Sequence, residues 1–161
     1  MIVVKYHKGK YTLPVILEDK SILMKFDTGS QNTVISIKEL YPSEKKEQLC
    51  KVCERLRKHK VQDFILANKD KISGIWCVAK NARIGDVEIP KLYFNLILDV
   101  EHPIALLGDD FISGCKFDHK PDGDVFISAF DHERQTTVLK QQGLEALELN
   151  SLECELQEME S

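Results

Sequence analysis

One aspartate has a setting in which a carboxylate could do chemistry. Asp27 ends the apolar run 22–26 within the stretch KFDTGSQNTVIS. A carboxylate emerging from the core is costly unless it is hydrogen-bonded. Gly29 permits a sharp turn, and the hydroxyls of Thr28 and Ser30 are neighbouring donors. The same four residue types are common in ordinary turns, so the tetrapeptide alone fits either a turn or a catalytic loop.

The elements around this loop are predicted to be mostly short strands separated by turns. Ser36 and Glu39 have capping-box spacing for a short helix, and 44–60 is predicted to be an amphipathic helix with one apolar stripe. A mainly β fold with an inserted helix favours a small closed barrel, because closure protects strand edges. The predicted strands are 11–17, 21–27, 32–36, 63–67, 72–84, 87–98 and 125–130.

A second motif follows about half the chain later. Leu106 and Leu107 are large apolar residues that precede Gly108 and a predicted short helix. With this pair of motifs, the sequence resembles the retropepsin-like aspartic proteases over roughly residues 11–117. The resemblance implies a barrel of the acid-protease type, a loop that carries catalytic Asp27, and an apolar-apolar-Gly segment that buttresses this loop from behind.

The resemblance also implies roles for the residues after Asp27. Thr28 would hydrogen-bond across a dimer axis, and Gly29 would let a backbone amide approach the substrate. Ser30, where many retroviral members have alanine, would donate to the Asp27 carboxylate and favour its ionised form. On this interpretation, Ser30→Ala would raise the pH optimum of the activity.

Peptide hydrolysis by this route needs two carboxylates that share one proton, and two like charges so close together cannot both ionise. The chain has one D-T-G. Asp109 and Asp110 follow the supporting glycine and lack the Thr-Gly turn, and Asp122 stands in a predicted hairpin turn. The sequence therefore predicts a twofold homodimer in which each copy contributes Asp27, acting on a peptide or protein substrate without a cofactor or metal.

A hairpin around 64–78 is expected to be the flap that closes over substrate. Trp76 would pack in the core or line a pocket, with core packing favoured. At the dimer interface, strands 2–6 and 125–130 would be the equivalents of the terminal strands that interleave in retroviral members. The expected flap residues are Asn68, Lys69, Asp70, Lys71 and Gly74.

Composition and charge argue against two other classes of function, nucleic-acid binding and membrane spanning. The net charge is −4, and the acidity is concentrated after residue 144, where there are six Glu and no Lys or Arg. No dense basic patch indicates nucleic acid, and no apolar run approaches the ~20 residues that span a membrane. The start of the chain does not resemble a signal peptide, so a cytoplasmic location is expected. Two parts are predicted: a protease-like domain, 1–130, and an acidic tail, 131–161, that is helical or partly disordered.

Two alternatives to a protease remain at this stage. The same fold could serve as a binding or dimerisation module with little catalysis, because fold does not imply function. Cys50 and Cys53 have C-x-x-C spacing, but no second ligand pair accompanies them, and buried packing on the helix is the favoured interpretation over zinc or redox chemistry. The sequence does not indicate which substrate is used.

Overall fold

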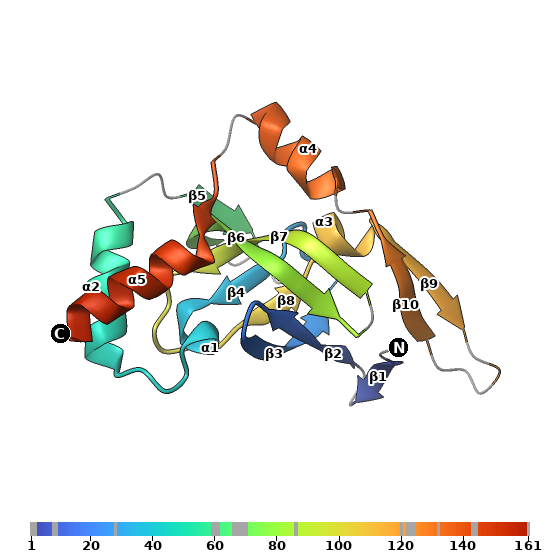
Figure 1. The fold of residues 1–161 in the computed structure, drawn as a ribbon, viewed down its shortest axis with the longest axis horizontal. Helices are drawn as coiled ribbons and strands as arrows, with labels where there is room; N and C mark the ends of the chain where they lie inside the picture. Colours follow the sequence, from blue (N-terminus) through green and yellow to red (C-terminus); the bar gives the residue numbers. More distant parts are fainter. Residues whose placement is uncertain are drawn as a thin grey trace.

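The computed structural model describes residues 3–7, 10–27, 29–58, 62–65, 71–85, 87–119, 121, 125–131, 133–142 and 145–160. Within these residues, eleven strands form one hydrogen-bonded sheet that is accompanied by five helices (Figure 1). The strands are β1 (Val3–His7), β2 (Lys10–Leu17), β3 (Lys20–Phe26), β4 (Val34–Ser36), β5 (Gln62–Ile65), β6 (Lys71–Ile84), β7 (Val87–Ile97), β8 (Ala105–Leu107), β9 (Cys115–His119), β10 (Val125–Phe130) and β11 (Leu147–Glu148). The helices are α1 (Ile37–Leu40), α2 (Lys46–Leu56), α3 (Asp109–Ile112), α4 (Glu133–Gln142) and α5 (Leu149–Glu160).

Six of the strands close into a barrel. Their order is β6-β7-β4-β8-β3-β2, and β2 returns to β6 where Ile16 pairs with Arg83. Closure removes the open edges that would otherwise be free to pair with other chains. The prediction of a mainly β fold with a closed barrel and an inserted helix is confirmed.

The two hairpins of the barrel follow from local turn chemistry. β2 and β3 pair antiparallel around Glu18, whose φ is 59°. β6 and β7 pair around Gly85, whose φ of 58° is easily adopted by a residue without a side chain. Both hairpins lie where the alternation of apolar and polar residues and the turn residues predict them.

The main core fills the barrel and extends under α2. Along the strands, alternate residues face inward, and Phe94 and Leu96 of β7 are fully buried. α2 lies over the same core with its buried stripe of Leu49, Val52, Cys53 and Leu56. The stripe matches the helix predicted from the sequence, although the helix is shorter than 44–60.

The terminal strands meet within one chain. β1 pairs antiparallel with β10 at Val3 with Phe126 and at Val4 with Val125. β10 also pairs with β9, and the β9–β10 hairpin projects from one side of the barrel in Figure 1. β9 was not predicted as a separate strand. The two strands expected to interleave between subunits thus contact each other here.

The tail is packed against the rest of the molecule. α5 lies beside α2 in Figure 1 and is anchored through buried Leu149, Leu152 and Leu156. Before it, β11 pairs in parallel with β6 at Cys77 and Val78. This two-residue strand gave no recognisable signal in the sequence.

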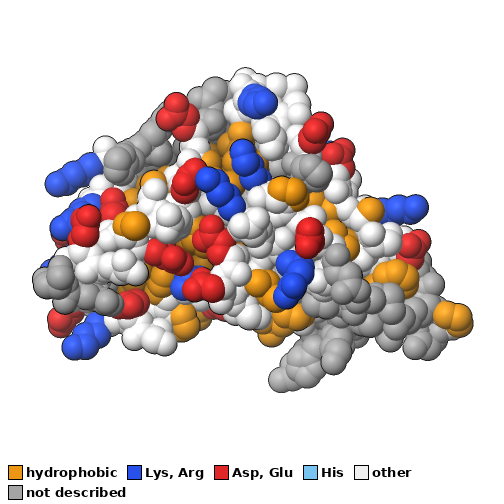
Figure 2. Space-filling model, in the orientation of Figure 1, with side chains coloured by type: hydrophobic (Ala, Val, Ile, Leu, Met, Phe, Trp, Pro, Cys, Tyr) orange, Lys and Arg blue, Asp and Glu red, His pale blue; other side chains and the backbone are white. Residues whose placement is uncertain are grey.

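The visible face of the molecule has no large area in which all charged side chains have the same sign. On the face drawn in Figure 2, basic and acidic side chains are interspersed, with apolar atoms between them. Among the described residues, no helix combines the length and apolar character needed to cross a bilayer.

Candidate active site

Asp27 lies directly after β3, on a backbone that is still held by the sheet. Its N–H donates to the Leu107 carbonyl at 2.9 Å, which continues the parallel pairing of Lys25 with Leu106 and Phe26 with Leu107. Phe26 packs against the main core. Because side chains alternate along a strand, Asp27 lies on the opposite, outer face of the sheet, where it is half-exposed.

The turn after Asp27 is held by hydrogen bonds between residues close in the chain. The Gly29 N–H donates to Asp27 Oδ1 at 3.1 Å, and the Ser30 N–H donates to the Asp27 carbonyl at 3.1 Å. Ser30 is buried, and its hydroxyl donates to the Asn32 carbonyl at 2.8 Å. A hydroxyl has one proton to donate, so the expected hydrogen bond from Ser30 to the Asp27 carboxylate is wrong. Thr28 lies outside the described residues.

Gly108 lies against the back of this loop. Its N–H donates to Thr33 Oγ1 at 3.2 Å. A Cβ at Gly108 would lie 2.4 Å from both C and O of Asn32 and 2.9 Å from its N. Real Cβ atoms do not approach other atoms so closely, so this position requires glycine. The segment that ends at Gly108 therefore passes directly behind the loop.

The first turn of α3 adds two backbone hydrogen bonds. The Asp109 N–H donates to the Ser30 carbonyl at 2.8 Å, and the Asp110 N–H donates to the Gln31 carbonyl at 3.2 Å. The loop is thus fastened to β8 at one end and to α3 along its length. A carboxylate on such a loop is held in a fixed position, which general acid-base chemistry requires.

Asp110 is part of this support. Its Oδ1 accepts from Thr33 Oγ1 at 2.8 Å and from the Phe111 N–H at 2.8 Å, and its Oδ2 accepts from Gln135 Nε2 at 3.2 Å. Burial raises the pKa of Asp110, while these hydrogen bonds act in the opposite direction. Because both of its carboxylate oxygens accept hydrogen bonds, the Asp110 side chain helps to hold the loop in place. Asp109 is exposed at the start of α3.

Sequence reasoning missed Thr33, Asn95 and Gln135 as parts of this site. The Thr33 carbonyl accepts from both the N–H and the side-chain Nδ2 of Asn95, at 2.8 and 3.1 Å. Buried Gln135 of α4 reaches Asp110 from the tail. The one available signal was Asn95 itself, a polar residue within the otherwise apolar run 92–98.

The expected flap is described in part. β5 pairs antiparallel with β6, with Ile65 opposite Lys71 and Gln62 opposite Gly74. Gly74 is buried and also pairs with Ile97 of β7. It therefore lies at the base of the hairpin and not at its tip. The expected tip residues Asn68, Lys69 and Asp70 lie outside the described residues, as does the side chain of Lys71.

The cysteines of α2 have the surroundings of packing residues. Cys53 is buried and Cys50 is half-buried, and neither forms a disulfide. Burial raises the pKa of Cys53 to about 11, so its reactive thiolate is scarce near neutral pH. In the described ranges, no three His, Cys, Asp or Glu side chains gather as a metal site would require.

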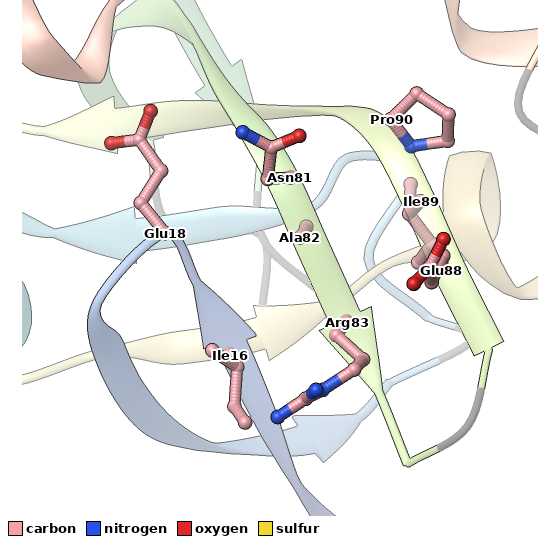
Figure 3. A pocket seen from close by; sticks show the side chains of 8 residues that line it. All are labelled: Ile16, Glu18, Asn81, Ala82, Arg83, Glu88, Ile89 and Pro90. Atoms are coloured by element: carbon pink, nitrogen blue, oxygen red, sulfur yellow. The ribbon is translucent and has the colours of Figure 1, made fainter.

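A surface pocket of about 350 Å³ lies elsewhere on the barrel (Figure 3). Figure 3 shows the Arg83 side chain extending toward Ile16 of the paired strand β2. Glu18 and Asn81 line it and both have positive φ, 59° and 58°. None of the predicted site residues lines this pocket. Its lining residues are Ile16, Glu18, Asn81, Ala82, Arg83, Glu88, Ile89 and Pro90.

No family model matches the sequence, and no curated protein matches it. One solved structure that matches is described as a retropepsin-like aspartic protease from Rickettsia conorii. It has 20% sequence identity and a TM-score of 0.49, and the match covers 78% of this chain and 97% of that chain.

Proposed function

We propose that this chain is an aspartic endopeptidase in which Asp27 is the catalytic carboxylate. One observation carries the proposal: the half-exposed Asp27 side chain stands on a loop whose backbone is fastened to β8 and α3. A turn that only reverses the chain has no need for the close approach of Gly108 behind it. Such support is what a catalytic group needs to keep its position during reaction.

The proposed chemistry uses two carboxyl groups and one water molecule. The ionised carboxylate accepts a proton from water as the water oxygen bonds to the carbonyl carbon of the peptide. The protonated carboxyl donates to the carbonyl oxygen, and a tetrahedral diol forms. The C–N bond then breaks as a proton passes to the leaving nitrogen. The dyad titrates as a pair, so its apparent pKa values belong to neither carboxyl alone.

The second carboxyl group comes, in this proposal, from Asp27 of a second copy of the chain. Asp110 has both oxygens occupied by Thr33, Phe111 and Gln135. A twofold homodimer places identical residues beside each other at its axis. The site is thus incomplete in one chain, and activity depends on dimerisation.

The test is cleavage of a mixed peptide library between about pH 4 and 7, the range in which carboxylate dyads work. Asp27→Asn keeps the size of the side chain and removes its acid-base function, and we expect it to lower cleavage by at least about 100-fold. Asp109→Asn is the matched control, since it removes an exposed carboxylate next to the same loop and should leave cleavage unchanged. Cleavage that survives in Asp27→Asn contradicts the proposal.

The oligomeric state gives an independent check. Sedimentation at micromolar concentration should show twice the chain mass of 18.4 kDa. An active monomer would contradict the shared dyad. A dimer that cleaves no peptide would favour the alternative function, a binding or dimerisation module of the same fold.

A further inference from the structure

An apolar patch lies on the outer face of the barrel, separate from the main core. We call it the outer patch. Its buried members on the barrel are Val34, Trp76 and Ile97, and Tyr93, Ile104 and Leu106 pack at its margin. Trp76 is the single tryptophan of the chain. A patch of large apolar side chains on the outside of a barrel requires a cover or a ligand.

The outer patch shares its face of the sheet with Asp27. Leu106 pairs with Lys25, two residues before Asp27, and also with Val34. Directly paired residues point to the same side of a sheet, and residues two apart along a strand do so as well. Asp27, Leu106 and Val34 therefore face the same side, opposite the Phe26 and Leu107 side chains.

Helix α4 and the residues after it cover the outer patch. Leu139 of α4 is 4% exposed and belongs to the same apolar cluster, and Ala146 packs at its edge. Beyond Ala146, β11 pairs with the edge of β6 at Cys77 and Val78. The tail thus crosses the outer face of β7 and β6, and α4 stands above these strands in Figure 1.

Gln135 attaches α4 to the open edge of β7. On the side facing β4, pairing of β7 with β4 begins at Asn95, opposite Val34. Two residues before Asn95, where β4 no longer pairs with β7, the Tyr93 N–H donates to Gln135 Oε1 at 3.1 Å. Gln135 Nε2 donates to the Tyr93 carbonyl at 3.2 Å. A side-chain amide has the same donor and acceptor as a peptide group. Gln135 therefore occupies this edge as the backbone of an extended peptide would.

We propose that α4 is a displaceable cover. Its Gln135 amide and its Leu139 side chain occupy the face of the sheet where an extended peptide with an apolar side chain would bind beside Asp27. The identification of that peptide as a substrate rests on the proposed function. Two buried residues, Gln135 and Leu139, make the attachment among the described α4 side chains. Opening of α4 breaks the Gln135 hydrogen bonds to Tyr93 and to Asp110 Oδ2, and leaves Asp110 Oδ1 held by Thr33 and the Phe111 N–H. Most of the other α4 side chains that the structure describes, including those of Lys140 and Gln141, are exposed.

With a cover, the apparent affinity for the peptide equals the intrinsic affinity multiplied by the fraction of time that the cover is open. When the competent state has a population of about 10% or less, removing the cover strengthens peptide binding about tenfold or more. Leu139→Asp in the full chain should open the cover, because the outer patch does not accommodate an unpaired carboxylate. Gln141→Asp adds the same charge at an exposed position of the same helix and is the matched control.

Trp76 fluorescence reports the cover without requiring dimerisation or catalysis. We expect Leu139→Asp to shift Trp76 emission to longer wavelength and to increase its quenching by acrylamide, whereas Gln141→Asp should match the wild type. A synthetic peptide of residues 133–146 should reverse the shift, and the same peptide carrying Leu139→Asp should not. Unchanged Trp76 emission in a folded Leu139→Asp protein, or a shift that the peptide fails to reverse, overturns the proposal. If Leu139→Asp does not fold, Leu139→Ala is measured in the same way.

Peptide cleavage separates this proposal from the proposed function. Leu139→Asp should raise kcat/KM on the cleaved library peptides about tenfold or more over the wild type, mainly through KM. Slower cleavage with a well-exposed Trp76 would show that α4 assists the reaction, and would overturn the cover. If no variant cleaves any peptide, the proposed function fails, and the Trp76 measurements alone decide whether α4 is a cover.

Discussion

Replacing Gly108 by alanine would insert a methyl group where the backbone of the Asp27 loop passes. The added Cβ would lie 2.4 Å from C and O of Asn32. These are backbone atoms, so no side-chain rotation relieves the contact. The φ of Gly108 is −90°, which alanine adopts readily. The effect of the substitution on the folded state is therefore steric.

The magnitude follows from the size of this overlap. Non-bonded carbon atoms rest about 3.5–4.0 Å apart, so the loop must retreat by about 1 Å. Overpacking of this kind costs about 1–3 kcal/mol, and the lower entropy of the unfolded alanine chain offsets about 0.4–1 kcal/mol of it. A net loss of about 1.3 kcal/mol lowers the Tm of a chain of this size by roughly 3–5 °C. A shift of about 1 Å at Asp27 should also slow peptide cleavage about 100-fold.

Thermal unfolding by circular dichroism and peptide cleavage measure the two effects. Gly114→Ala is the control, because its added Cβ would meet the movable ring of Phe130 at 3.1 Å and the Asp131 carbonyl at 3.3 Å. We expect a smaller change in Tm and little change in cleavage. If Gly108→Ala unfolds at the wild-type temperature, or no lower than Gly114→Ala, the close support of the loop by Gly108 is refuted.

Two further predictions concern the same loop. Ser30→Ala removes the hydrogen bond to the Asn32 carbonyl and should destabilise the fold by about 1 kcal/mol in urea unfolding, with an unmoved pH–rate profile; a displaced profile would show that the hydroxyl acts on Asp27. Burial raises the pKa of Asp110 in the folded chain, so Asp110 contributes more to folding stability at low pH. This contribution is fully present below the pKa of Asp110 in the unfolded chain, near 3.8, and is lost as pH rises through its pKa in the folded chain. Wild-type stability relative to the non-titrating Asp110→Asn should thus increase as pH is lowered from neutral toward 4, and a difference that stays constant would contradict the raised pKa.

Much of the fold could be predicted because its signals are local. The β2–β3 hairpin, the turn at Gly85 and the buried stripe of α2 all follow from residues within one element or one turn. Ser36 caps α1 by accepting from the Glu39 N–H at 3.3 Å, as the spacing of the two residues predicts. Such features depend on alternation, helical periodicity and capping, which neighbouring residues determine together.

The sequence by itself placed Asp27 at the end of a strand, because apolar alternation and the turn residues are local signals. That Gly108 lies behind the loop was implied by the family resemblance alone. Only the tertiary structure showed the hydrogen bonds that join Thr33, Asp110 and Gln135, because these residues are far apart in the chain. It also decided that the Ser30 hydroxyl donates to Asn32 instead of Asp27. Alternation along a strand shows which side chains share a face. What covers that face depends on how distant segments pack, and here helix α4 covers it.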